Sequence, residues 1–296
     1  MYSISNSKLI VTVSPMGAEL QSIKNRRRHE YLWQGDSRIW GRRSPILFPI
    51  VGSLWHGKYH IGDNEYQLSR HGFARDMEFQ LVEKTSSSLV FELTDTPETM
   101  ESYPYRFGLR VGYKLQGNTV HVVWEVHNRD SRRIYFSIGG HPAFRLPGYK
   151  KGEPVVGRLQ LEPTSQSQSL WWLEKAEIGQ GGCLREERNP LDTDSQMVLH
   201  FTEETFKDDA IVVDRSQLRG ISILTAAGKP VVKVDFQTPA VGIWKPYGKQ
   251  APFVCIEPWY GVADSVGYEG QLKEKYLINA LQPGGTFKGG YDMTFY

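Results

Sequence analysis

The feature that most constrains the fold of this 296-residue chain is a pair of alternating apolar stretches between residues 109 and 126. Apolar or aromatic residues occupy every second position on both sides of the turn Gln116-Gly117-Asn118, at Leu109, Val111, Tyr113, Leu115, Val120, Val122, Trp124 and Val126. A period of two is typical of a strand with one buried face, and a short turn containing glycine joins such strands into a hairpin. The stretch therefore predicts two antiparallel strands.

Shorter strand-like stretches bounded by turn residues recur through the rest of the chain. We predict strands at residues 9–13, 19–23, 89–93, 134–138, 198–201, 210–213, 221–224, 231–236 and 241–244, and a hairpin over 58–68. Residues 148–194 are rich in Ser, Gln, Gly and Glu and predict loops. No segment keeps a helical period for three turns with capping residues. The pattern predicts an all-β fold, a large antiparallel β-sandwich forming a single domain over residues 1–296.

Composition excludes several functional classes. Hydrophobic residues make up 40% of the chain and charged residues 23%, which suits a packed core. A net charge of +2 gives no electrostatic case for nucleic acid, and no apolar run is long enough to span a membrane. The N-terminal stretch lacks the layout of a signal peptide, so we expect a cytoplasmic protein. Cys183 and Cys255 suggest neither a disulfide framework nor a zinc site.

One carboxylate stands out because of its place beside an apolar strand. Residues 253–256 form an apolar run, Glu257 follows at once, and Pro258 is expected to end the strand. A poorly solvated carboxylate needs a partner or a raised pKa, and both are features of a general base. The alternative is a glutamate that only bonds backbone groups at a strand end.

Two further loop stretches place polar side chains beside glycine or proline. His141 follows the expected strand 134–138 through Gly139-Gly140, and the loop 71–76 carries His71 and Arg75. Asp209 is a weaker candidate. A lone histidine is more often structural, but several polar groups in the same context favour a site. No HExxH-type helix is present, so we predict no metal, and the absence of GxGxxG and P-loop motifs indicates no nucleotide cofactor.

Tryptophans are numerous near these loops. Trp33, Trp40, Trp55, Trp244 and Trp259 offer aromatic faces. Such faces suit the C–H surfaces of sugars, although core packing is the alternative for each of them.

Five stretches together resemble the aldose 1-epimerase (galactose mutarotase-like) superfamily, and within it the LacX-like branch. They are SPILFPIVG, QLSRHGFARDMEF, SIGGHPAF, FKDDAIV and APFVCIEPWYGVADS, and they follow the family's order from about residue 40 to residue 265. The resemblance implies a β-supersandwich with a sugar cleft. It also implies an isomerase that needs no cofactor and interconverts the α and β anomers of a hexose or hexose phosphate.

The resemblance also implies roles for single residues. Glu257 would be the base that takes the proton of the C1 hydroxyl, and His141, cationic at the start, would be the acid that protonates the ring oxygen. His71 would bind substrate and help to polarise the ring oxygen, and Asp209 would hold sugar hydroxyls. Arg75 and Trp259, from the same matching stretches, are expected to contact the substrate.

The arginine of the site is the point at which this sequence departs from the pattern. Relatives commonly carry arginine after the FPIVG stretch, where this chain has Ser53. Arg42 resembles the arginine upstream of the same stretch in hexose-6-phosphate mutarotase relatives, so we expect Arg42, or its neighbour Arg43, to contact substrate. The alternative is that both arginines are solvated or paired with acidic residues such as Asp36.

Two other functions remain open at this level. One is a non-catalytic sugar-binding or sensor protein on the same fold, since a fold alone does not grant activity. The other is a metal-dependent sugar isomerase. In each case the expected partner is a small-molecule sugar, with no nucleic acid and no membrane, and the protein is expected to be a monomer or a homodimer.

Overall fold

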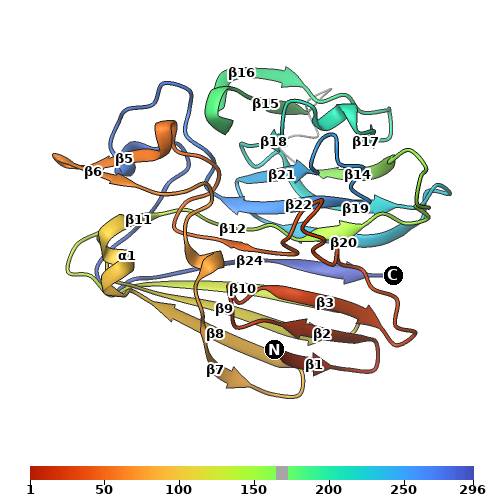
Figure 1. The fold of residues 1–296 in the computed structure, drawn as a ribbon, viewed down its shortest axis with the longest axis horizontal. Helices are drawn as coiled ribbons and strands as arrows, with labels where there is room; N and C mark the ends of the chain where they lie inside the picture. The colour runs from red at the N-terminus through yellow and green to blue at the C-terminus, as the bar shows by residue number, and fades with distance from the viewer. Residues whose placement is uncertain (165–172) are drawn as a thin grey trace.

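The computed structural model describes residues 1–164 and 173–296, and two large antiparallel sheets dominate it (Figure 1). The nine-stranded sheet contains, in spatial order, β17 (Val198–Phe201), β14 (Gly157–Pro163), β19 (Leu218–Leu224), β20 (Pro230–Phe236), β24 (Thr286–Phe295), β10 (Thr119–Asn128), β9 (Phe107–Gln116), β8 (Ser88–Thr94) and β7 (Gln80–Lys84). The eight-stranded sheet contains β16 (Leu184–Pro190), β15 (Glu174–Ile178), β18 (Ile211–Val213), β21 (Ala240–Trp244), β22 (Phe253–Tyr260), β12 (Ile138–Gly140) and β4 (Ile46–Leu47), with β13 (Ala143–Arg145) also paired to β22. This all-β, antiparallel architecture confirms the predicted fold class.

Smaller elements complete the structure. A three-stranded sheet of β1 (Tyr2–Ser5), β2 (Leu9–Val13) and β3 (Leu20–Asn25) lies across β8 to β10 in Figure 1, and the Tyr2 ring meets the Phe91 ring at 5.7 Å. The remaining strand pairs are β5 (Lys58–Ile61) with β6 (Asn64–Gln67), and β11 (Ile134–Phe136) with β23 (Asn279–Leu281). The helices are α1 (Pro97–Ser102) and the short 3-10 turns η1 (Trp55–Gly57), η2 (Ala74–Asp76), η3 (Gln180–Gly182), η4 (Glu204–Phe206) and η5 (Leu272–Glu274). None of the described helices is both long enough and apolar enough to cross a bilayer.

The hairpin of β9 and β10 behaves as its alternating pattern predicts. Leu115 pairs with Val120 and Val111 with Trp124, and all four side chains are buried. They join a hydrophobic core that runs from Ile4 near the N-terminus to Phe295 near the C-terminus. Burial of this apolar face, together with the ladder of backbone hydrogen bonds, explains why the segment forms two strands.

Two sequence predictions differ from the structure because neighbouring strands decide where a strand ends. Residues 134–138 were expected to form one strand, but β11 pairs with β23 while β12 pairs with β22 and β4. The break falls at Ser137, whose N–H donates to the Pro49 carbonyl at 2.7 Å instead of to a ladder partner. Residues 148–194 also carry β14, β15 and β16 and not only loops, and residues 165–172 of that prediction lie outside the described residues.

The expectation that Pro258 ends its strand is wrong. β22 continues to Tyr260, with Pro258 opposite Val241, so Glu257 lies inside the strand. The Ile256 N–H donates to the Pro142 carbonyl at 3.3 Å, on the side where β12 and β13 are separated. Because strand residues alternate, the missing N–H of Pro258 faces the same interruption. A proline there removes no ladder hydrogen bond.

Candidate active site

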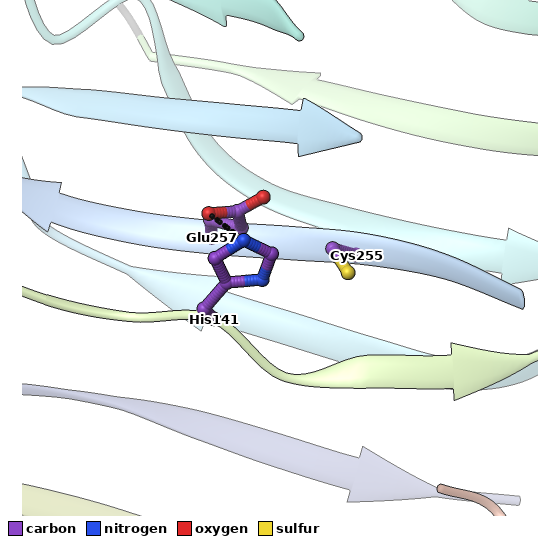
Figure 2. Close-up of side chains that lie close together, drawn as sticks. All are labelled: His141, Cys255 and Glu257. Carbon is purple, nitrogen blue, oxygen red and sulfur yellow. Dashed lines mark ion pairs between the residues drawn. The ribbon is translucent and has the colours of Figure 1, made fainter. Parts of the chain in front are cut away.

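The interruption between β12 and β13 brings His141 against Glu257. The His141 backbone N–H donates to the Pro45 carbonyl at 3.1 Å, and its Nε2 lies 3.2 Å from Glu257 Oε2 (Figure 2). Their side chains are only 8% and 2% exposed. Two groups that lie 116 positions apart in the sequence thus form one buried acid–base pair.

The pair faces a cavity of about 170 Å³. Polar side chains from four chain segments line it, namely Arg70, His71, Arg75, His141, Asp209 and Glu257. Trp40, Trp244 and Trp259 supply aromatic walls. Six of the seven residues expected at the site are therefore together, and Arg42 is the exception.

Burial sets the protonation of the pair. It raises the pKa of Glu257 well above its usual value, against the nearby positive charge of Arg70. It lowers the pKa of His141 to about 3, with Arg70, Arg75 and Arg42 acting in the same direction. Both shifts favour a protonated Glu257 and a neutral His141. The resemblance implies a cationic His141 at the start of the reaction, so that reaction requires the proton to move from Glu257 to His141 first.

With these directions of shift the pair would hold one proton near neutral pH, which is what acid–base exchange requires. Glu257 Oε2 lies 3.2 Å from Nε2 but makes no hydrogen bond to it, so it is available to a hydroxyl in the cavity. The titration steps belong to the pair and not to either residue alone.

Aromatic rings fix the imidazole of His141. Trp40 stacks on it at 4.9 Å with an interplanar angle of 27°, and Trp244 meets it edge-on at 5.5 Å and 85°. Of the five tryptophans singled out in the sequence, Trp40, Trp244 and Trp259 line the cavity. Trp33 packs on Phe253 instead. The same rings that orient His141 also exclude water from it, which is the cause of its lowered pKa.

Glycines provide the space for the third aromatic wall. A Cβ atom at Gly139 would lie 2.5 Å from Trp259 Cδ1, and one at Gly242 would lie 2.4 Å from Trp259 Cη2. The absence of a side chain at Gly139 makes room for this indole. Any larger residue at either position would displace Trp259.

His71 is held in a defined tautomer. The Gly52 N–H donates to His71 Nδ1 at 3.0 Å, so Nδ1 carries no proton. Burial lowers the pKa of His71 well below its usual value, and His141 adds to that shift. A neutral imidazole with an occupied Nδ1 has its proton on Nε2. His71 therefore offers an N–H donor, and its ring stands edge-on to His141 at 5.6 Å.

Arg70 is a charged residue of the cavity that the sequence did not single out as a candidate. Arg70 Nη2 donates to Asp209 Oδ2 at 2.8 Å, and Arg75 Nη2 donates to the Arg70 carbonyl at 2.7 Å. A Cβ atom at Gly182 would lie 2.9 Å from Ser53 Oγ and 3.4 Å from Arg70 Cζ. Arg70 thus lies close to Ser53, where relatives were expected to carry arginine. Its position directly before His71 in the matching stretch was the available signal.

The arginines expected upstream are engaged elsewhere. Arg42 does not line the cavity, and its Nη2 donates to Asp76 Oδ1 at 2.7 Å. Arg43 bonds Gln21 and the Gln34 carbonyl. Asp36, suggested as an alternative partner for both, pairs with Arg38.

Two cavity residues have backbone conformations that side chains rarely adopt. His71 has φ of 70° and Asp209 has φ of 89°, both in the left-handed region. Non-glycine residues there raise the free energy of the folded state by about 1 kcal/mol or more. Such strain clusters at functional sites, where the position of a side chain matters more than stability.

A buried ion pair supports one wall of the cavity. Lys275 Nζ lies 2.8 Å from Asp264 Oδ1, and these side chains are 1% and 2% exposed. Asp264 Oδ2 accepts the Trp55 N–H at 2.9 Å, and the Asp264 carbonyl accepts the Leu184 N–H at 2.7 Å. Leu184 and Ala263 line the cavity, so the ion pair and the hydrogen bonds of Asp264 join four chain segments behind its surface.

One group of potential metal ligands lies at the site. Among the described residues, His141, Cys255 and Glu257 each bring a ligand atom within 4.8 Å of the others (Figure 2). Metal binding requires a thiolate, but burial and the neighbouring Glu257 raise the pKa of the Cys255 thiol well above its usual value. His141 and Glu257 already pair with each other. The donor chemistry does not favour a metal, and we identify no metal ligands here.

Comparison with known proteins shows the family of the sequence and its fold. The sequence profile of the aldose 1-epimerase family matches residues 1–284. The chromosomally encoded protein LacX of Lactococcus lactis is 32% identical, over 98% of both chains. Among solved structures, a galactose mutarotase related enzyme from Lactobacillus acidophilus superposes with a TM-score of 0.90 at 34% identity, covering 100% of this chain and 97% of the other. A galactose mutarotase-like protein from Lactobacillus casei gives 0.93 at 28% identity, covering 100% of both.

Proposed function

The chain belongs to the aldose 1-epimerase family, and on that premise we propose that it is a mutarotase that interconverts the α and β anomers of a hexose or hexose phosphate. The observation that carries the proposal is the buried pair of Glu257 and His141, whose carboxyl and imidazole lie 3.2 Å apart at the cavity surface. Mutarotation removes a proton from one oxygen of the sugar and adds one to another, so it needs such a pair.

The proposed reaction requires the proton to move first from Glu257 to His141. Glu257 takes the proton from the C1 hydroxyl as His141 gives its proton to the ring oxygen, and the C1–O5 bond breaks to leave an open-chain aldehyde. Rotation about C1–C2 and the reverse transfers close the ring on the other face. After ring opening Glu257 is protonated and His141 is neutral. This is the arrangement that burial favours, so the cavity supports the open-chain state.

The remaining cavity residues serve binding in this proposal. His71 donates its Nε2 proton to a sugar oxygen, Asp209 accepts from sugar hydroxyls, and Trp259 covers an apolar sugar face. Arg75 is half-buried beside the cavity and contributes a further donor. None of these roles calls for a cofactor.

A screen for faster anomer exchange tests the function directly. NMR exchange spectroscopy on hexoses and hexose phosphates should show at least one sugar whose anomers exchange faster with enzyme than with buffer. The screen is run with EDTA present, so that a required divalent ion is revealed by activity that returns only when the metal is restored. Exchange at the buffer rate for every sugar would contradict the proposal.

The two histidines should respond differently to substitution. His141→Asn removes a group that acts in the transition state, so kcat and kcat/KM should fall together, by about 10²–10⁴-fold. His71→Asn keeps a residue that tolerates positive φ, and it should raise KM at least as much as it lowers kcat. Steady-state kinetics on the best sugar from the screen separates these cases. The opposite pattern would exchange the two roles.

A further inference from the structure

Trp40 covers the imidazole of His141 with one face of its indole. The centroids of the two rings lie 4.9 Å apart at an interplanar angle of 27°. The Trp40 N–H donates to the Asp36 carbonyl at 2.8 Å, and the Trp40 carbonyl accepts from Trp33 Nε1 at 2.8 Å. The indole also packs on the ring of Phe253 at 5.7 Å. Backbone hydrogen bonds and a neighbouring ring therefore hold the indole against the imidazole.

We propose that Trp40 is a positioning residue that favours the cationic form of His141, because its indole face attracts the charge that the imidazole carries once it has taken a proton. The inference rests on the proposed function, in which the proton must reach His141 before the sugar ring opens. The face of an indole is electron-rich, and a cation within about 6 Å of the ring centroid is attracted to it. The attraction is stronger where water is excluded, and the His141 side chain is 8% exposed. An aliphatic side chain in the same place would exclude water without attracting the charge.

The groups around His141 set the balance on which this attraction acts. Glu257, on β22, gives up the proton, and its Oε2 lies 3.2 Å from His141 Nε2. On the same strand, burial raises the pKa of the Cys255 thiol well above its usual value, and His71 stands edge-on as a neutral imidazole. Trp244, on β21, lies at 85° to the imidazole. Burial lowers the pKa of His141 to about 3, and three positive charges act in the same direction, those of Arg70, Arg75 and Arg42.

Fluorinated tryptophans test the attraction while the indole keeps its shape. Each fluorine withdraws electron density from the face of the ring, so the attraction to a cation weakens. With mono-, di- and trifluorinated tryptophan placed in turn at position 40, kcat for the best sugar from the screen should fall stepwise, by about threefold in total, while KM stays unchanged. The loss of rate is smaller than the loss of attraction, because a less stable imidazolium gives its proton to the ring oxygen more readily.

Trp33 provides a matched control. Its ring lies 4.8 Å from that of Phe253 at an interplanar angle of 31°, close to the geometry of Trp40 on His141, but a phenyl ring cannot take a proton. Fluorination keeps the indole N–H that donates to the Trp40 carbonyl. The same series at position 33 should therefore leave kcat at the wild-type value.

Ordinary substitutions at position 40 give a second comparison. Trp40→Phe keeps an aromatic face and should keep most of kcat. Trp40→Leu keeps an apolar cover without such a face, and it should lower kcat at least as far as trifluorinated tryptophan does. A role in packing alone would give the two variants the same kcat and would leave the fluorine series flat.

A further readout does not depend on turnover. In the free protein, NMR of the ring nitrogens of His141 reports formation of the imidazolium as the pH is lowered. Because a weaker attraction leaves burial less opposed, the onset should move to lower pH by about half to one unit across the fluorine series. This shift in a protein without measurable turnover would support the role of Trp40 and contradict the proposed function. Normal turnover with the same kcat across the series would overturn the inference, and so would a rise in KM alone, which would assign the indole face to the sugar.

Discussion

Replacing Glu257 by glutamine is expected to lower catalysed mutarotation by about 10²–10⁴-fold while the protein stays folded. The amide has the shape of the carboxyl but can neither take the C1 proton nor pass one to His141. Because burial favours the protonated form of Glu257, a neutral isostere should leave the stability close to that of the wild type. Polarimetry on a freshly dissolved α-aldose measures the loss.

The control for this variant is the same substitution at a glutamate that lies outside the cavity. Glu269 is exposed and does not line the site, so Glu269→Gln should keep the wild-type rate. Thermal unfolding of both variants checks the fold. A folded Glu257→Gln protein that catalyses at the wild-type rate would remove Glu257 from the role of base.

Replacing Lys275 by methionine should produce the largest loss of stability, about 3–5 kcal/mol in the free energy of unfolding. Asp264 would be left as a charge that is 2% exposed, without the Nζ that now lies 2.8 Å away. The loss should also loosen the wall formed by Leu184 and Ala263. Urea denaturation measures the first effect, and KM for the sugar reports the second.

Two further variants test whether the loss of the buried ion pair causes the expected decrease in stability. Lys275→Met combined with Asp264→Asn removes the uncompensated charge and should recover part of the stability, which is the sign of coupling between the two residues. Lys273→Met alters an exposed lysine two positions away and should change the stability by no more than about 0.5 kcal/mol. Equal effects of Lys275→Met and Lys273→Met would show that the buried pair is unimportant.

The fold class could be predicted because the alternation of apolar and polar residues is visible within each single strand. In the segment 109–126, the alternating apolar residues indicate the strands and their buried face, and the glycine-containing stretch between them indicates the turn. The exact ends of strands could not be predicted in the same way. Ser137 ends β11 because the neighbouring strand changes, and Pro258 is tolerated in β22 because the strand beside it is interrupted. Both facts depend on residues far away in the sequence.

The same distinction applies to the site. His71, Arg75, His141, Asp209 and Glu257 meet at one cavity, as their matching stretches implied. Their protonation could not be inferred from those stretches, since the neutral state of His141 follows from burial among rings contributed by two other segments. Arg70 was missed for a related reason. The sequence shows that position 53 is a serine and not an arginine, but it does not show that the side chain of Arg70 lies close to that position.

The left-handed backbone conformation of Asp209 creates a trade-off at this position between the stability of the fold and the function of the side chain. Glycine adopts a φ of 89° without the penalty that a side chain brings, and the exposed part of the ion pair with Arg70 offsets little of that penalty. A population screened only for survival at high temperature should therefore accumulate glycine at position 209. If the proposed mutarotase activity is needed for growth, a population grown on the sugar should retain aspartate at this position.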